Sequence, residues 1–291
     1  MLKNFREFYE KKLAVKIITV LIIVFLSVAI MLPLMKIAAI FGINIKEHTG
    51  INFKVTFGNV FFFLLYGFCA IVIIWIAQRY IHKKKFSELG FRSKILWPII
   101  FGFIFGATLI STRYIGYILS VESVKLTYIG IPEGVSILTY LSYYLYFIFG
   151  FIFFNSFIEE LTTKAYPIEK LKNYMNPHII FTIMGVIFAV GHFFARDFNF
   201  GYFITLFMFS YIASLIYYYS GSIWLSVGVH SGINWVSFSF MGTVPNWKLG
   251  TLYTIEISQV PSWVINYANL PIQFGVLLLI IFLGKKGFFN V

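Results

Sequence analysis

Long apolar runs recur along this chain, and they constrain its fold more than any other feature. Of its 291 residues, 59% are apolar and only 12% are charged, whereas an average soluble domain has about 25% charged residues. An apolar run of 18 or more residues is typical of a helix that crosses a bilayer. We therefore predict an all-α fold, a polytopic membrane bundle of about eight helices that forms a single domain over 1–291. The expected spans are 14–41, 57–78, 95–120, 136–163, 178–196, 200–219, 222–242 and 262–283.

The net charge of +12 could indicate a nucleic-acid partner, but the distribution of the basic residues favours a membrane. Sixteen Lys and Arg side chains fall on one side of the predicted spans, in residues 1–16, 78–94, 162–175 and 284–291. Five fall in the opposite loops: Lys46, Lys54, Lys125, Arg196 and Lys248. Because basic loops stay in the cytoplasm, both termini are expected there, in a multi-pass protein of the bacterial plasma membrane. We expect membrane lipid and a peptide or protein substrate as partners, and no nucleic acid.

Two adjacent acids interrupt one of the apolar runs. Of the eleven acidic residues, only Glu159 and Glu160 lie within a predicted span. A charge at the centre of a bilayer costs about 2.5–3.5 kcal/mol on insertion scales, so such residues face the interior of a bundle and mark functional sites. The glutamate pair is therefore the first candidate for chemistry.

Two histidines and an asparagine also lie within predicted spans. Glu159 and His192 each lie 16.5 positions from the point between residues 175 and 176 in the turn NYMNP, so an antiparallel helix hairpin would place them at the same depth. Asn234 follows His230 by four residues, so both project from one helix face. These four residues are predicted to line one cavity.

Each of these residues also has a purely structural explanation. Glu160 and Lys164 are spaced i,i+4 and could neutralise each other, which leaves Glu159 without that partner. A histidine such as His192 is often only packed and hydrogen-bonded, and Asn234 could join two helices. The joint occurrence favours function, because a carboxylate beside a histidine can deprotonate water. Two imidazoles and a carboxylate can also hold a divalent metal, and an amide can donate to an oxyanion.

Three motifs occur in order along the second half of the chain. They are E-E-x-x-x-K at 159–164, F-x-x-x-H at 188–192 and H-x-x-x-N at 230–234, the last preceded by G-S-I-W at 221–224. This set resembles the CPBP family of CAAX-protease and bacteriocin-processing intramembrane endopeptidases, also called the Abi family. The resemblance covers a core at about 136–242.

The resemblance implies a role for each residue. Glu159 would activate water with help from His192, while His230 and Asn234 would complete the site as a ligand or an oxyanion stabiliser. Glu160 would support the local structure through residue 164. The family is called metalloprotease, so a divalent metal such as zinc is a candidate cofactor, with Glu159, His192 and His230 as its candidate ligands.

Residue 164 departs from the family pattern, and two other functions are compatible with the same residues. The family has arginine where this chain has Lys164, and lysine lacks the planar fork of a guanidinium. A family member could instead be a membrane scaffold or a bacteriocin-immunity protein without turnover. A proton-coupled transporter could also use buried Glu and His, although neither inverted repeats nor paired broken helices are evident.

Overall fold

The computed structural model describes residues 12–43, 57–91, 94–119, 124–128, 131, 134–194, 197–239, 253–257, 263, 267 and 269–289. Four of the five basic residues expected in the opposite loops, and the terminal residues 1–11 and 290–291, lie outside these ranges. The predicted orientation of the termini therefore stays a prediction.

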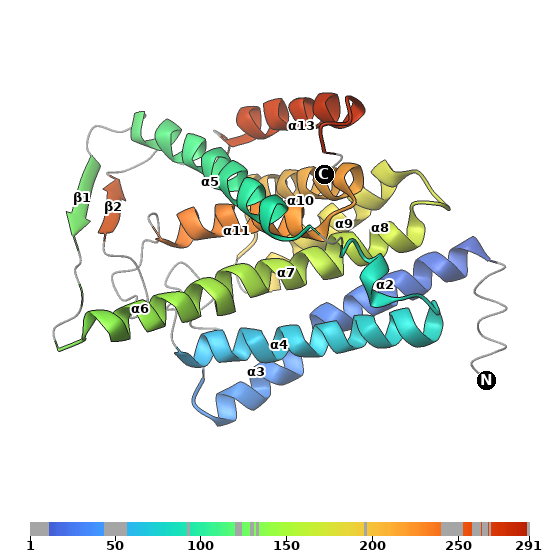
Figure 1. The fold of residues 1–291 in the computed structure, drawn as a ribbon, viewed down its shortest axis with the longest axis horizontal. Helices are drawn as coiled ribbons and strands as arrows, with labels where there is room; N and C mark the ends of the chain where they lie inside the picture. Colours follow the sequence, from blue (N-terminus) through green and yellow to red (C-terminus); the bar gives the residue numbers. More distant parts are fainter. Residues whose placement is uncertain are drawn as a thin grey trace.

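The described residues form a bundle of long helices, as Figure 1 shows, and this confirms the predicted all-α membrane bundle. Its main helices are α2 (Leu13–Ala29), α3 (Met31–Ile40), α4 (Phe57–Ile76), α5 (Leu96–Leu119), α6 (Ile137–Tyr146), α7 (Phe154–Glu160), α8 (Tyr166–Leu171), α9 (Pro177–Gly191), α10 (Phe200–Ser220), α11 (Ile223–Ser239) and α13 (Asn269–Lys285).

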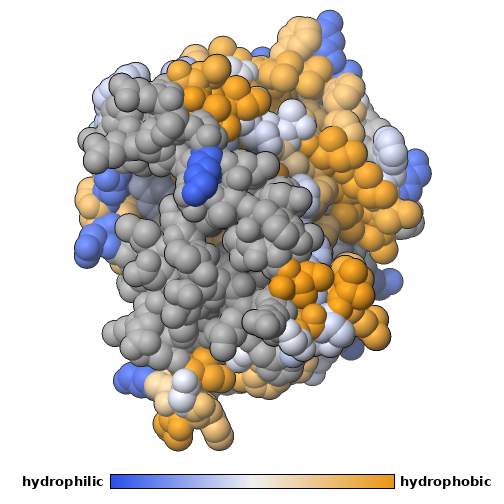
Figure 2. Space-filling view, turned by 90° about the vertical axis from the view of Figure 1, so that its left-hand side faces the viewer, coloured by the Kyte–Doolittle hydropathy of each residue, from blue (hydrophilic) through white to orange (hydrophobic). Residues whose placement is uncertain are grey.

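Five helical segments in the described part of the chain are long and apolar enough to cross a membrane. They are Leu13–Ile40, Val60–Ile81, Leu96–Ile115, Ile137–Leu171 and Phe200–Ser220. The other three predicted spans correspond to α9, α11 and α13, which have 15, 17 and 17 residues. Large apolar side chains on the outside, such as Phe25, Leu96 and Phe149, are more than 60% exposed. Hydrophobic residues reach the surface along the flank visible in Figure 2, as expected of a bundle surrounded by lipid.

Segment Ile137–Leu171 is one continuous helix with two π-helical turns, and it is longer than the predicted span 136–163. The turns are Phe147–Phe153 and Leu161–Ala165, and α7 lies between them. Pro167 has no N–H to donate back along the helix, which accounts for the irregular turn that precedes it. Such π turns are frequent at functional sites because they change which face of a helix a residue occupies.

Helices α5 and α11 approach each other closely, and glycines permit this. A Cβ atom on Gly106 would collide with the carbonyl of Val229, and one on Gly232 would collide with the carbonyl of Phe103. The small residues of segment 221–232 therefore allow close helix contact, as small residues do in membrane bundles. This contact fixes α11, which carries His230 and Asn234.

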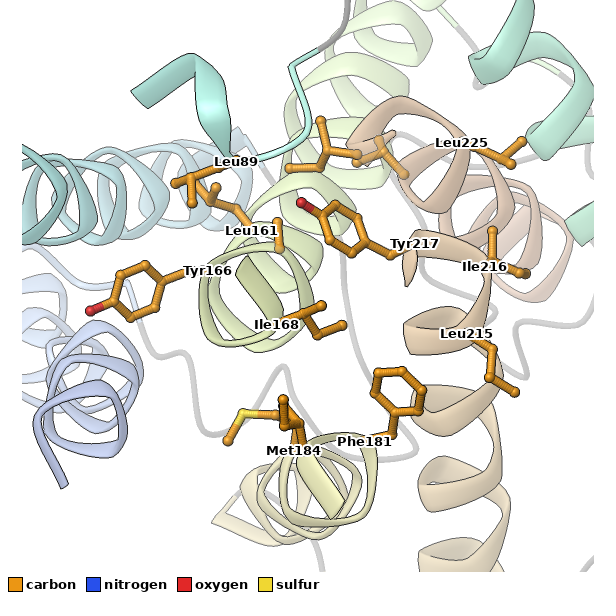
Figure 3. Packing of buried hydrophobic residues seen from close by; sticks show 14 of the residues in the cluster. Leu89, Leu161, Tyr166, Ile168, Phe181, Met184, Leu215, Ile216, Tyr217 and Leu225 are labelled. Atoms are coloured by element: carbon orange, nitrogen blue, oxygen red, sulfur yellow. The ribbon is translucent and has the colours of Figure 1, made fainter. Parts of the chain in front are cut away.

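The core surrounds the helix that contains α7 and α8, which lies between α4 and the pair α10 and α11 (Figure 1). Figure 3 shows buried side chains from several helices converging on this segment. The cluster includes Leu89, Leu161, Tyr166, Ile168, Phe181, Met184, Leu215, Ile216, Tyr217 and Leu225.

One element of the fold was not predicted. Strands β1 (Val124–Tyr128) and β2 (Tyr253–Ile257) pair antiparallel, with Val124 opposite Ile257 and Tyr128 opposite Tyr253. The sheet lies beyond the ends of α5 and α11, at the left of Figure 1. Both segments, VKLTY and YTIEI, are rich in β-branched and aromatic residues, which favour strands.

Candidate active site

The two adjacent glutamates end α7 and have different surroundings. The side chain of Glu160 is fully buried, whereas that of Glu159 is 24% exposed. The hydroxyl of Thr163 donates to the carbonyl of Glu159 at 2.7 Å, and that of Thr162 donates to the carbonyl of Ile158 at 2.7 Å. These bonds give two backbone carbonyls partners at the point where the π turn changes the helix pattern.

Glu160 has a cation and an imidazole as partners. Its Oε1 lies 3.6 Å from Nζ of Lys164 and 2.9 Å from Nδ1 of His230. Because a carboxylate can only accept, the histidine carries a proton on Nδ1. The predicted ion pair with Lys164 is therefore present, and Glu160 also orients the ring of His230.

Lys164 is fully enclosed by the protein. Its Nζ donates to Oγ1 of Thr163 at 2.9 Å and lies 3.9 Å from the ring centroid of Phe188. With no exposed surface, this lysine balances the charge of Glu160 from inside the bundle.

Glu159 faces the other nitrogen of the same histidine. Its Oε2 lies 3.6 Å from Nε2 of His230, while its Oε1 accepts a hydrogen bond of 2.9 Å from Nδ2 of Asn155. The sequence left Glu159 without the Lys164 partner, and the structure supplies a neutral amide instead. His230 thus lies between two carboxylates, that of Glu160, which is fully buried, and that of Glu159, which is partly exposed.

Asn234 and His192 complete the set. Asn234 donates from Nδ2 to Oγ of Ser156 at 3.2 Å, which connects α11 to α7. His192 follows directly after α9, and its Nδ1 donates to the carbonyl of Phe188 at 2.8 Å. A neutral ring with a proton on Nδ1 has its lone pair on Nε2, which can accept a proton.

The ring of Phe188 connects the two histidines. Its centroid lies 4.6 Å from that of His192 and 6.3 Å from that of His230. Glu159, Glu160 and His230 are therefore in direct contact, while Ser156 connects Asn234 to this group and Phe188 connects His192 to it.

Two side chains in this site were missed at the level of sequence. Neither Ser156 nor Asn155 was among the candidate residues. The signal for Asn155 was present, because it precedes Glu159 by one helical turn at the same i,i+4 spacing as Glu160 and Lys164. The contact between Ser156 and Asn234 joins residues 78 positions apart, and no local pattern reveals it.

The predicted zinc ligands have the right chemistry, because neutral imidazole and carboxylate are usual zinc ligands. In the ranges that the structure describes, however, no three His, Cys, Asp or Glu side chains group closely enough to hold a metal. The geometry therefore supports a carboxylate and imidazole site and does not by itself form a three-ligand metal centre.

An apolar groove of about 640 Å³ runs between α5 and α11. Trp235, the residue after Asn234, lines it, and the indole Nε1 donates to the hydroxyl of Tyr144 at 2.8 Å. The other lining residues are Phe103, Ile104, Ala107, Thr108, Ser111, Tyr114, Ile115, Ile118 and Val236.

Comparison with known proteins supports the motif-based resemblance. Residues 141–236 match the model of the family described as type II CAAX prenyl endopeptidase Rce1-like. The match covers 141–236 of the 291 residues and makes this segment similar to that family. It contains all four candidate catalytic residues and lies within the predicted core at 136–242. No curated protein matches the chain.

Proposed function

We propose that this chain is an intramembrane endopeptidase that hydrolyses a peptide bond with water activated by Glu159. One observation carries the proposal. Oε2 of Glu159 lies 3.6 Å from Nε2 of His230 in a partly open position, while the neighbouring Glu160 is buried and engaged by Lys164. Only Glu159 is thus available to a water molecule and a substrate.

The chemistry needs no nucleophile from the protein. Glu159 takes a proton from water, and the water oxygen attacks the carbonyl carbon of the scissile bond. Nδ2 of Asn234 has a second N–H beyond the one given to Ser156, and it donates to the developing oxyanion. When the C–N bond breaks, Glu159 returns the proton to the leaving amine, so a carboxylate and an amine form.

The two histidines position the reacting groups in this scheme. Glu160 holds the ring of His230 with its Nε2 toward Glu159. Nδ1 of His192 donates its proton to the carbonyl of Phe188, so Nε2 is the nitrogen that accepts a hydrogen bond from the water. No step requires a metal, and the zinc site at Glu159, His192 and His230 stays a prediction that metal analysis of wild-type protein and of His192→Ala can test.

The proposed substrate is a peptide carried at the membrane. The name of the matching family refers to CAAX prenyl endopeptidases, and the apolar groove that Trp235 lines offers a surface for an alkyl or prenyl chain. A prenylated CAAX peptide is therefore the first substrate to assay, with a peptide pheromone precursor and a bacteriocin leader as the next two.

The test is cleavage of these peptides by the full chain in proteoliposomes. Removing a general base costs roughly 10²–10⁴-fold in rate, so Glu159→Gln is expected to lose cleavage by that factor while it folds and inserts normally. Glu169→Gln is the matched control, because Glu169 is partly buried but pairs with Lys172 away from the site. Full activity of Glu159→Gln would overturn the proposal and favour a scaffold or a transporter.

A further inference from the structure

We propose that Asn155 and Ser156 are positioning residues, one for the base and the other for the oxyanion donor. The inference rests on the proposed function and extends it to two residues that precede the glutamate pair by one helical turn. Asn155 acts through Glu159, and Ser156 acts through Asn234.

Asn155 fixes the direction of the Glu159 carboxylate. Its Nδ2 donates to Oε1 at 2.9 Å along one turn of α7, and this leaves Oε2 directed toward His230. A carboxylate oxygen can only accept, so the amide nitrogen is the group that faces it. Because the donor is neutral, it restricts rotation of the carboxylate without neutralising the charge that a base needs. One residue later, the cation of Lys164 instead compensates the charge of the Glu160 carboxylate.

Ser156 fixes the amide of Asn234 across the helix interface. Its side chain is fully buried, and its Oγ accepts from Nδ2 at 3.2 Å. With Nδ2 directed at the hydroxyl oxygen, this hydrogen bond holds the plane of the Asn234 amide in one orientation. The second N–H of the amide, the proposed donor to the oxyanion, therefore also has a fixed direction.

The two contacts set the separation between base and oxyanion donor. Asn155 and Ser156 are consecutive, so their side chains leave α7 about 100° apart. One reaches Glu159 on the same helix, and the other reaches Asn234 on α11. Catalysis depends on such placement, because a displacement of about 1 Å can cost roughly 100-fold in rate.

The experiment measures kcat and KM for a farnesylated CAAX peptide in proteoliposomes. Loss of a hydrogen bond to a charged group predicts a drop in kcat of roughly 10-fold for Asn155→Ala, with KM unchanged. Asn155→Asp has the same shape but places a second carboxylate against Glu159, so it is expected to lose roughly 100-fold. Asn155→Gln keeps an amide donor and is expected to recover to within about threefold of wild type.

Asn176→Ala is the control for Asn155→Ala, because it removes an asparagine side chain that lies away from the site. Asn176 accepts from the backbone N–H of His178 at the start of α9, away from the site. Asn176→Ala is therefore expected to lower the unfolding midpoint and to leave kcat at the wild-type value.

The Ser156 variants are compared with Ser214→Ala, because Ser214 is as fully buried as Ser156. Ser156→Ala is expected to lower kcat about 10-fold, and Ser156→Thr, which keeps the hydroxyl, to restore it. The hydroxyl of Ser214 is also buried but donates to the carbonyl of Ser210 within its own helix. Ser214→Ala should therefore keep the wild-type kcat.

The outcomes separate this inference from the proposed function. Wild-type kcat in Asn155→Asp and Ser156→Ala, with Glu159→Gln inactive, overturns the inference and leaves the proposed function standing. Active Glu159→Gln overturns the proposed function itself. In a third outcome, every variant loses kcat only to the extent that it loses folding, and neither Asn155→Gln nor Ser156→Thr restores kcat. This outcome shows a packing role and also overturns the inference.

Discussion

Two buried polar clusters lie along residues 154–171, one around Glu160 and one around Tyr166. In the first, Glu160 meets Lys164 at 3.6 Å and accepts a hydrogen bond from His230 at 2.9 Å. In the second, the hydroxyl of Tyr166 and Nε2 of His82 lie 2.8 Å apart. The first cluster brings ionisable groups of opposite charge together, whereas the second joins a phenol to an imidazole.

The difference shows how burial acts on an ionisable group with and without a counter-charge. Burial lowers the pKa of His82 to about 3, and the charge of Lys170 lowers it further in the same direction. His82 is therefore neutral near pH 7. Glu160 instead has a cation within reach, which is what a buried carboxylate needs to stay ionised. A charged cluster lies at the proposed site and a neutral one lies just beyond the end of the Val60–Ile81 span.

The largest expected effect comes from removing the cation of the charged cluster. Lys164→Met keeps the length of the side chain but leaves Glu160 without its counter-ion, and breaking such a buried pair costs about 3–5 kcal/mol. The free energy of unfolding in detergent measures this loss. Adding Glu160→Gln to Lys164→Met should recover more than half of it, because a buried pair replaced as a whole is often nearly neutral.

A second lysine pair provides the control. Lys172 and Glu169 lie 2.8 Å apart, but their side chains are 34% and 18% exposed. Lys172→Met is therefore expected to cost below about 1 kcal/mol. If Lys164→Met were as stable as the wild type, Glu160 would be protonated or would have another partner.

The neutral cluster predicts a dependence of stability on pH. The unfolded chain binds a proton at a histidine below about pH 6.5, but folded His82, with a pKa of about 3, does not. Stability contributed by this group is thus complete above pH 6.5 and is lost as the pH falls toward 3. By pH 5 the loss is about 2 kcal/mol.

The measurement compares unfolding of wild type and His82→Gln between pH 7.5 and pH 5. Glutamine can still reach the hydroxyl of Tyr166 but does not titrate. The wild type should lose stability more steeply than the variant by the stated amount. Equal slopes in the two proteins would show that His82 does not stay neutral in the fold.

Sequence patterns predicted the helices and the ion pair of Glu160 with Lys164, because both signals are local or compositional. Eight apolar segments gave eight helical segments, and the spacing of Glu160 and Lys164 gave their ion pair. Length was predicted less well, because α9 ends at Gly191 rather than near 196. The π turns were also not predicted, since they depend on Pro167 and on threonine hydroxyls that bond back to the helix.

Contacts across helices account for most of what the sequence did not show. His230 was grouped with Glu159, but the closer carboxylate is that of Glu160 at 2.9 Å. A difference of one residue along a helix turns a side chain by about 100°, and the π turn at Leu161–Ala165 changes the angle again. Which of two adjacent glutamates meets the Nδ1 of a histidine is therefore set by packing between α7 and α11, which a single sequence does not encode locally.

The smallest expected effect tests why this chain has lysine where the family has arginine. Oε2 of Glu160 is buried and has no hydrogen-bond partner among the described residues. The planar fork of arginine can reach both carboxylate oxygens and can stack on an aromatic ring such as Phe188. Lys164→Arg is therefore expected to raise the free energy of unfolding by about 1 kcal/mol.

The same substitution should leave kcat within about threefold of wild type, because Lys164 contacts Glu160, Thr163 and Phe188 and is fully buried. Unfolding and peptide cleavage measured on one preparation give both numbers. A rise in kcat of tenfold or more would show that residue 164 acts on the substrate and that lysine limits the wild-type rate. A loss of stability would instead show that the enclosed site has no room for a guanidinium, and that lysine is present because of its smaller head group.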